Sequence, residues 1–344
     1  MFTRRTFLMS AAASLTNGRI DEACAKLQSA TSTGEVSAAV LHVQQRGQVF
    51  ERGFGKARSA KEVFLLASIT KPMTAAAVMR LVDRGAVSLD RTAKTYVPEF
   101  QGGDRDRITV RQLLTHTSGL PDMLPENTEL RKRHAPLKDF VAATCKTPLL
   151  FAPGSEVRYQ SMGILLAAEI VERVTRQPLR EFLRREVFGP LKMTSASLGL
   201  GGREIADTAR SQVTGDDDWN WNSMYWRDLG APWGGAHASA GDVGKFLSYF
   251  LHPRDGILKA STARQMVTNQ NAGLNKPWGI GFMVDGSAFG KSCSTNTFGH
   301  WGSTGTVTWA DPAKDLILVL LTTKPADQSR AGLLGPVSDR ISQM

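Results

Sequence analysis

Near both ends of the chain, apolar residues gather in short runs bounded by turn-forming residues, a pattern typical of β-strands. The first two runs cover residues 36–44 and 48–54, and the residues between them suit a hairpin turn. Three further runs, near the C-terminus, cover residues 278–284, 304–310 and 315–323. Because short turns join neighbouring strands, the pattern predicts an antiparallel sheet made from both chain ends.

Between these ends, apolar residues recur every three or four positions, which predicts helices. The strongest helical runs cover residues 73–85, 109–116, 161–175 and 241–251. Two more helices are expected nearer the chain ends, over residues 18–31 and 328–344, the second broken near Gly335 and Pro336. The fold class that follows is α+β, an α/β sandwich in which helices flank the sheet and a large, mostly helical subdomain is inserted into it.

No internal repeat or low-complexity linker divides the chain, and 344 residues suffice for one large domain. We therefore expect a single domain over residues 18–344. Its sheet subdomain would comprise residues 18–60 and 271–344, and its helical subdomain would comprise residues 61–270.

The first residues of the chain resemble a bacterial export signal. Residues 3–8 read TRRTFL, which is similar to the twin-arginine motif, and a short apolar stretch follows. Residues 1–17 are therefore predicted to be an export signal, which implies a periplasmic or extracellular protein. The alternative is a chance pair of arginines in a cytoplasmic protein, because the apolar stretch is short and no A-x-A cleavage site follows it.

The composition excludes several classes of protein. Hydrophobic residues make up 42% of the chain and charged residues 22%, as in ordinary soluble proteins, and no apolar run is long enough to span a membrane. The net charge of +10 is scattered; its densest cluster, at residues 131–134, is interpreted as a solvated loop, and no nucleic-acid-binding motif accompanies it. The three cysteines and six histidines show no metal-ligand spacing, so neither a metal nor a cofactor is expected.

One lysine stands in an apolar stretch, where an unpaired ammonium would be costly to bury. Residues 65–79 read LLASITKPMTAAAVM, which puts Ser68 and Lys71 on one face of a predicted helix. Because Pro72 is tolerated only in the first turn of a helix, Ser68 is expected at the helix N-terminus, where backbone N–H groups favour developing negative charge. Burial would lower the pKa of Lys71 from its ordinary value of about 10.4, as a base that deprotonates Ser68 requires.

Two further segments carry polar groups at junctions between predicted elements. Tyr159 and Ser161 stand at the start of an apolar helix and can present two hydroxyls to a cleft; an N-cap serine beside a packed tyrosine is the alternative. Residues 298–306 read FGHWGSTGT and precede a predicted strand. Their glycines allow a bound group to approach the backbone closely, although a simple glycine-rich turn has the same composition.

Together and in this order, the segments SITK, YQS and HWG resemble the three motifs of the serine β-lactamase and penicillin-binding-protein superfamily. The flanking segments resemble its class C β-lactamase-like branch, which includes family VIII esterases, D-stereospecific peptidases and transacylases. These segments are LLTHTSGLPD (113–122), FAPGSEVRYQSMGILLAAEIVE (151–172), APWGGAHASAGDVGKFL (231–247) and GHWGSTGT with the following DP and LILVLL (299–321). The resemblance covers most of residues 34–323 and implies a β-lactamase/transpeptidase-like fold.

The resemblance also implies a role for each matching residue of the first two motifs. Ser68 would be the acylated nucleophile, and Lys71 would help to deprotonate it. Tyr159 would act as general base or acid, with its phenolate stabilised by Lys71. Ser161 would hydrogen-bond Lys71, and it stands where the family often has an asparagine that can donate to a substrate carbonyl.

The third motif departs further from the family. His300, Trp301 and Gly302 would replace its Lys-Thr/Ser-Gly strand motif, and the backbone N–H groups of Ser68 and Ser303 would form the oxyanion hole. A histidine is mostly neutral at pH 7, unlike the lysine, and Trp301 would add an apolar wall. These departures favour neutral or apolar acyl groups over penicillins.

We therefore expect a serine hydrolase that works through an acyl-enzyme, either a carboxylesterase or a small-amide hydrolase, whose partner is a small ester, amide or peptide. A β-lactamase or D-Ala-type peptidase, and a non-catalytic binding protein of the same fold, are the alternatives. The G-x-S-x-G nucleophile elbow is not found, which argues against an α/β-hydrolase. Residues 219–233, rich in tryptophan, either line the pocket or seal a long loop, and His116 is expected to be structural.

Overall fold

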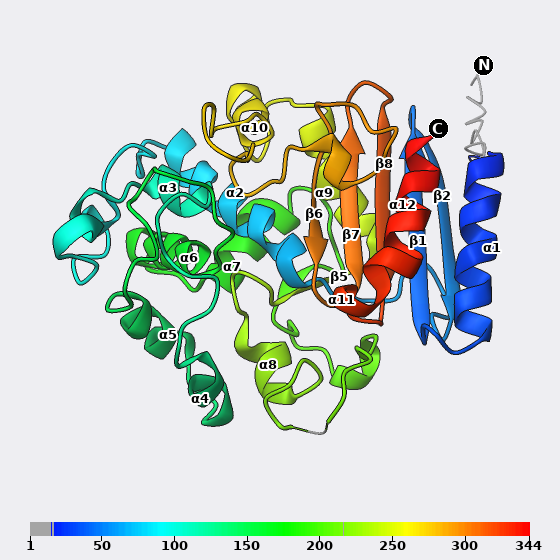
Figure 1. Ribbon diagram of the computed structural model, residues 1–344, viewed down its shortest axis with the longest axis horizontal. Coiled ribbons are helices and arrows are strands. Elements are labelled where there is room, and N and C mark those ends of the chain that lie inside the picture. Colours follow the sequence, from blue (N-terminus) through cyan, green and yellow to red (C-terminus); the bar gives the residue numbers. More distant parts are fainter. Residues whose placement is uncertain (1–14, 16, 216) are drawn as a thin grey trace, which may run out of the picture.

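In the computed structural model of the chain, five antiparallel strands form one sheet in the order β2-β1-β8-β7-β6 (Figure 1). The strands are β1 (Ala38–Gln45), β2 (Gln48–Gly55), β6 (Phe298–Gly302), β7 (Thr306–Asp311) and β8 (Leu316–Thr322). Strand β1 pairs directly with β8, so the two ends of the chain lie side by side in the sheet. The predicted antiparallel sheet made from both chain ends is confirmed.

The structure describes residues 15, 17–215 and 217–344. The predicted twin-arginine motif at residues 3–8 lies outside the described residues. Within them, no helix combines the length and the apolar character that crossing a bilayer requires.

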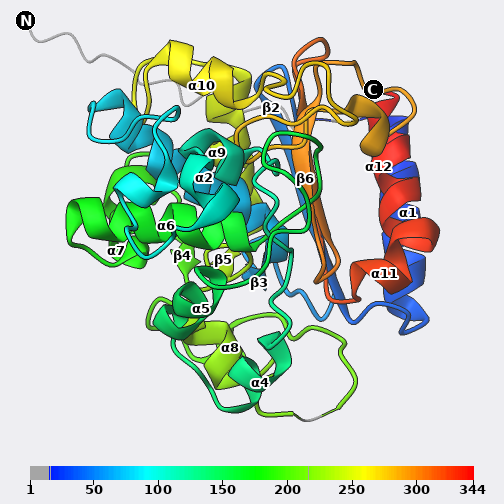
Figure 2. The same cartoon turned by 60° about the vertical axis from the view of Figure 1, so that its left-hand side comes forward.

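Helices cover both faces of the sheet, which explains why its central strands are apolar on both sides. On one face, α1 (Gly18–Ser32) and α12 (Gly335–Ser342) lie against each other (Figure 2). On the other face, α9 (Ala240–Leu251) contacts β1, β7 and β8. Every residue of β8 is buried between these layers, whereas β2 at the sheet edge is largely exposed.

The inserted region is mostly helical, as its apolar periodicity predicts. Its centre is formed by α2 (Thr70–Asp83), which packs against α6 (Met162–Thr175), and α3 (Val110–Leu114) also packs against α6. The other α-helices described in this region are α4 (Asn127–Lys132), α5 (Leu137–Thr144), α7 (Leu179–Leu183), α8 (Met224–Leu229) and α10 (Ala260–Met266), and α11 (Ala326–Ser329) follows β8 outside it. A small second sheet joins β3 (Phe64–Leu65), β5 (Ala236–Ala238) and β4 (Ser197–Leu198) in the order β3-β5-β4.

The strand predicted over residues 278–284 is wrong. This segment is irregular, and it pairs with the sheet only through one isolated bridge between Met283 and Gly299. Its backbone turns at Gly281, whose φ is +80° and whose N–H donates to the carbonyl of Leu114. Most apolar residues of the segment are buried because the loop packs into the core, so the apolar pattern records burial and not strand pairing.

The helical C-terminus differs slightly from its prediction. A π-helical turn over Arg330–Leu334 connects α11 to α12, and Gly335 then begins the regular helix instead of breaking it. Pro336 is tolerated there because the first turn of a helix requires few backbone donors. The subdomain boundaries near residues 60 and 270 remain predictions.

Candidate active site

Ser68 and Lys71 are in direct contact. Ser68 lies in a short 3₁₀ turn, Ala67–Ile69, which leads straight into α2, so the predicted position at a helix N-terminus is confirmed. The Lys71 Nζ donates hydrogen bonds to the Ser68 Oγ and to the carbonyl oxygen of Trp233, both at 2.9 Å. Lys71 is only 1% exposed, while Ser68 is partly accessible. A proton can therefore pass from Ser68 to Lys71 without rearrangement.

The backbone just before Ser68 is held in an unusual conformation. Ala67 has φ +49°, a left-handed value that costs a residue with a Cβ atom about 1–3 kcal/mol. The Thr306 hydroxyl donates to the Leu66 carbonyl at 3.0 Å and fixes this segment to β7. A Cβ at Gly302 would collide with both the Leu66 oxygen and the Thr306 Oγ1, so only glycine allows this close approach.

Burial makes Lys71 a usable base near neutral pH. Desolvation lowers the pKa of Lys71 to about 7, and the negative charge of Asp122 partly opposes that shift. A substantial share of Lys71 is therefore neutral near pH 7. A neutral amine can accept a proton, whereas an ordinary exposed lysine is almost fully charged at this pH.

Tyr159 stands over Lys71, with the lysine Nζ 4.7 Å from the centre of its ring. Burial raises the pKa of Tyr159 above its ordinary value, and a hydrogen bond with Ser68 only partly offsets this. Tyr159 is therefore a neutral phenol. The phenolate stabilised by Lys71 that the family resemblance implies is not favoured.

Ser161 has a different partner from the one expected. Its hydroxyl donates to the Asp122 Oδ1 at 2.6 Å, and of the described residues only Ser68 and Trp233 accept from Lys71. The expected Ser161–Lys71 hydrogen bond is thus replaced by a Ser161–Asp122 bond. The physical reason is that the one proton of the Ser161 hydroxyl goes to a nearby carboxylate, a strong acceptor, while the donors of Lys71 are directed at Ser68 and Trp233.

His300 and Trp301 point to opposite faces of the sheet, because successive residues of a strand alternate. His300 is buried toward the helical region, 5.9 Å from Tyr159 between ring centres, and burial lowers its pKa to about 3. Trp301 stacks against Phe289 on the α12 side of the sheet, with the Arg330 guanidinium 4.2 Å from its ring centre. The prediction of an apolar pocket wall at Trp301 is therefore wrong.

A cavity of about 310 Å³ opens onto Ser68. The cavity is lined by Trp221, Trp226 and Trp233 together with Tyr159. Of the two interpretations of residues 219–233, these three tryptophans therefore support the one in which the segment lines the pocket. Besides Ser68 and Tyr159, the polar lining consists of Asp122, Asn127, Arg131, Ser161, Ser303 and Thr304. His300, Trp301 and Gly302 do not line the cavity.

Two charged residues of this cavity were not predicted from the sequence. Asp122 lies in the flanking segment at residues 113–122, where the resemblance assigns it no role. Arg131 belongs to the cluster interpreted as a solvated loop, but its guanidinium stacks on Trp226 at 3.9 Å and on Trp219 at 5.2 Å. The sequence signal for this contact is the tryptophan-rich segment at residues 219–233, which begins 88 positions after Arg131. Arginine guanidinium groups commonly stack on tryptophan rings.

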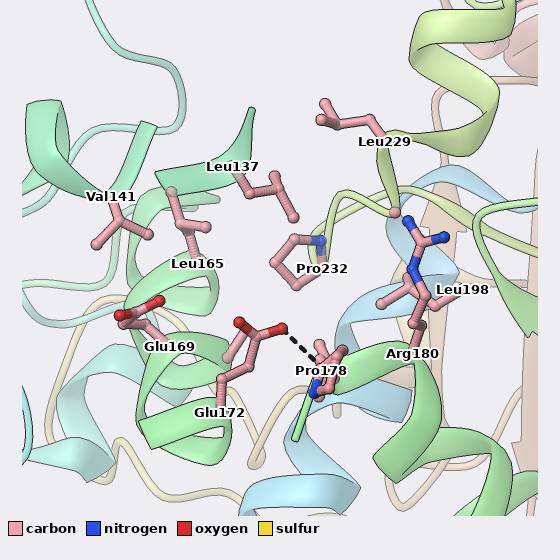
Figure 3. Close-up of a pocket in the computed structure, with 13 residues that line it drawn as sticks. Leu137, Val141, Leu165, Glu169, Glu172, Pro178, Arg180, Leu198, Leu229 and Pro232 are labelled. Atoms are coloured by element: carbon pink, nitrogen blue, oxygen red, sulfur yellow. Dashed lines mark hydrogen bonds between the residues drawn. The ribbon is translucent and has the colours of Figure 1, made fainter. Parts of the chain in front are cut away.

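A second cavity, of about 180 Å³, lies beside α6 and is drawn in Figure 3. Leucine side chains, among them Leu165 and Leu229, surround it, and the Glu172 Oε1 accepts from the Leu179 N–H at 2.7 Å. Among the described residues, its lining contains no serine, threonine, cysteine or lysine. This lining does not supply the nucleophile that acyl transfer requires, so the candidate active site is the one at Ser68.

The antiparallel sheet with its helical insertion, together with the Ser68–Lys71 pair at the start of α2, is typical of β-lactamase/transpeptidase-like proteins. The Beta-lactamase family model matches residues 23–336, and the chain belongs to this family. The chain is similar to N-acetylmuramyl-L-alanine amidase of Bacillus subtilis (strain 168), with 28% identity over 341 residues covering 83% of this chain and 77% of that protein. It is also similar to Esterase EstB of Burkholderia gladioli, with 34% identity over 169 residues covering 45% and 43% of the two chains.

A solved structure, that of a family VIII carboxylesterase, has the same fold. It superimposes with a TM-score of 0.76 at 19% identity, and the match covers 96% of this chain and 99% of that one. The predicted fold class and family are therefore confirmed. The roles of the individual residues stay predictions.

Proposed function

We propose that the protein is a serine hydrolase that forms an acyl-enzyme at Ser68 and acts on esters or small amides. The observation that carries the proposal is the 2.9 Å hydrogen bond between the Ser68 hydroxyl and an almost completely buried Lys71. A buried lysine without an ion pair is costly, and a base for Ser68 is a function that explains it.

In the proposed reaction, neutral Lys71 removes the Ser68 proton as the Oγ attacks the substrate carbonyl carbon. The backbone N–H groups of Ser68 and Ser303 would receive the negative oxygen. The Tyr159 hydroxyl then gives its proton to the leaving group as the bond between that group and the carbonyl carbon breaks, and Lys71 returns the Ser68 proton to Tyr159. Water next attacks the acyl carbon and gives a proton to Lys71. The bond between the acyl carbon and the Ser68 Oγ then breaks, the Oγ takes this proton, and the carboxylic acid leaves.

An ester or small amide is preferred over a penicillin because of two features. His300, in place of the family's lysine, has a pKa of about 3 and is neutral, so it adds no positive charge for a substrate carboxylate. The Ser161 hydroxyl is already committed to Asp122 and does not offer the amide donor of the family's asparagine. Relatives named as an esterase and as an amidase are compatible with both substrate types.

Labelling with a fluorophosphonate, followed by mass spectrometry of the peptides, tests the proposal. We expect the adduct on Ser68 and none in the Ser68→Ala variant. An adduct on another residue in active protein would refute the assignment of the nucleophile. Faster turnover of nitrocefin than of simple esters would instead favour the β-lactamase or peptidase alternative, and a folded protein that no probe acylates would favour the binding protein.

We also propose that residues 1–17 direct export to the periplasm or beyond. The TRRTFL sequence at residues 3–8 supports this. Replacing both arginines with lysine in a fusion to a reporter that requires twin-arginine export should abolish reporter activity. An unchanged reporter signal would favour the cytoplasmic alternative.

A further inference from the structure

Asp122 is a carboxylate in the wall of the catalytic cavity that the proposed reaction does not use. It lines the cavity together with Ser68, Tyr159 and Ser161. One of its oxygens accepts the Ser161 hydroxyl at 2.6 Å. Within the described part of the chain, Ser161 is the one hydrogen-bond partner of the Asp122 carboxylate, and Lys71 acts on it as a charge without a direct hydrogen bond. An ionised carboxylate can accept about four hydrogen bonds, which leaves most of its capacity for a ligand.

The polarity of this wall is the reverse of the one expected from an asparagine at position 161. An asparagine amide would offer N–H donors to a substrate carbonyl. Ser161 has one proton, and it is used in the bond to Asp122. The pair therefore presents only acceptors to the cavity. Its chemical complement is a donor, and a positively charged donor gains the most from an unpaired carboxylate.

The other charges around Asp122 are compatible with a cationic group in this place. Lys71 has a pKa of about 7, which Asp122 raises, and the buried His116 and His300 have pKa values well below neutrality. Arg131 also lines the cavity, but its guanidinium is held on the faces of two tryptophans and donates to a backbone carbonyl. Of these described groups, Lys71 is thus the cation that can lose its charge when a second cation arrives.

We propose that Asp122, positioned by Ser161, binds a protonated amine on the acyl side of the substrate, so that amino-acyl esters and amides are the preferred class. This inference rests on the proposed function at Ser68. An ammonium paired with Asp122 cancels the negative charge that holds a proton on Lys71. The matching substrate therefore shifts Lys71 toward its neutral form, in which it removes the Ser68 proton. Binding and activation of the base are linked through Asp122.

The test compares the ethyl esters of alanine, N-acetylalanine and propionic acid near neutral pH. These esters differ at one position, where they carry a cation, a neutral amide or a hydrogen. For the unmodified protein we expect kcat/KM for the alanine ester of one enantiomer to exceed that of the propionate ester by at least about tenfold. In Asp122→Asn this ratio should fall by about tenfold or more. Ser161→Ala should lower the ratio less, because it only frees the carboxylate to move.

Complete fluorophosphonate labelling of Ser68 shows that each variant is folded. If Asp122→Asn slows all three esters equally, or if N-acetylalanine ester is the best substrate, the inference is overturned. It is also overturned if Ser68 is labelled but the alanine ester is not cleaved. If Ser68→Ala keeps full activity on the esters, the proposed function itself fails, and this result is separable from the others.

Discussion

The carbonyl oxygen of Trp233 accepts a hydrogen bond from the Lys71 Nζ at 2.9 Å, across 162 positions of the chain. The residue that begins the proposed reaction is therefore oriented by the same segment whose tryptophans line the cavity. Pro232, one position earlier, accepts from the Thr74 hydroxyl at 2.7 Å and fixes this segment to α2. A substrate that displaces the tryptophan wall would therefore also displace the oxygen that orients Lys71.

The first prediction concerns the Ser68–Lys71 pair as a unit. Ser68→Ala and Lys71→Ala should each lower kcat/KM for a neutral ester by about 10³-fold or more, and the double variant should be no worse than the poorer single variant. The reason is that each change removes the same proton transfer. Lys26→Ala, an exposed lysine on α1, is the matched control and should keep full activity. Losses that multiply in the double variant would show that the two residues act independently.

A second prediction follows from the lowered pKa of Lys71. Because the base must be neutral, kcat/KM for a neutral ester should rise with pH through a limb centred near pH 7. Asp122 raises the pKa of Lys71, so removing its charge in Asp122→Asn must lower that pKa and move the limb to lower pH. Rates measured over the whole pH range with the propionate ester give the midpoint. A limb that stays in place or moves upward would contradict the electrostatic link between Asp122 and Lys71.

Gly302 carries the third prediction. In Gly302→Ala the new methyl group would collide with the Leu66 carbonyl and the Thr306 hydroxyl. We expect this overpacking to cost about 1–3 kcal/mol of the free energy of unfolding and to displace the strand that ends beside Ser68, which lowers kcat. Gly332→Ala is the control, because none of the described atoms lies within 4 Å of the position that its new methyl group would take. Urea unfolding gives the free energy of unfolding of both variants. Equal values would contradict the conclusion that only glycine fits at position 302.

Most of the fold was readable from the sequence because it follows local patterns. The alternation and runs of apolar residues located β1, β2, β7 and β8, and the 3.6-residue period located α2 and α6. The prediction for residues 278–284 was wrong, since burial in a loop leaves the same apolar pattern as burial in a strand. The pairing of β1 with β8 was expected only in outline, because register depends on contacts between distant segments.

The candidate site, like the fold, has some parts that local sequence patterns predict and others that they do not. Ser68, Lys71 and Tyr159 stand in motifs with fixed spacing, and the structure brings all three together. Asp122 reaches the site through long-range folding, and no local pattern indicates its position. Trp233 belongs to the tryptophan-rich residues 219–233, for which a pocket role is one of two interpretations, but its bond to Lys71 depends on contacts between distant segments. Successive side chains of a strand point to opposite faces of the sheet. The sequence interpretation places the HWG motif before a strand, whereas the motif lies within β6, so the sequence did not predict which face His300 or Trp301 would occupy.

The last prediction tests the opposite orientations of two tryptophans. Trp221 lines the cavity, whereas Trp301 stacks on Phe289 at the far face of the sheet and donates to the Ala288 carbonyl at 3.1 Å. Trp221→Leu should therefore change KM for esters with large acyl groups by about three- to tenfold while the midpoint of thermal unfolding moves little. Trp301→Leu should do the reverse: it loses packing and a hydrogen bond, which lowers the thermal midpoint, and leaves the ranking of esters unaltered. Kinetics over an ester chain-length series and thermal melts of both variants separate the two effects, and a changed chain-length ranking in Trp301→Leu would restore that residue to the pocket.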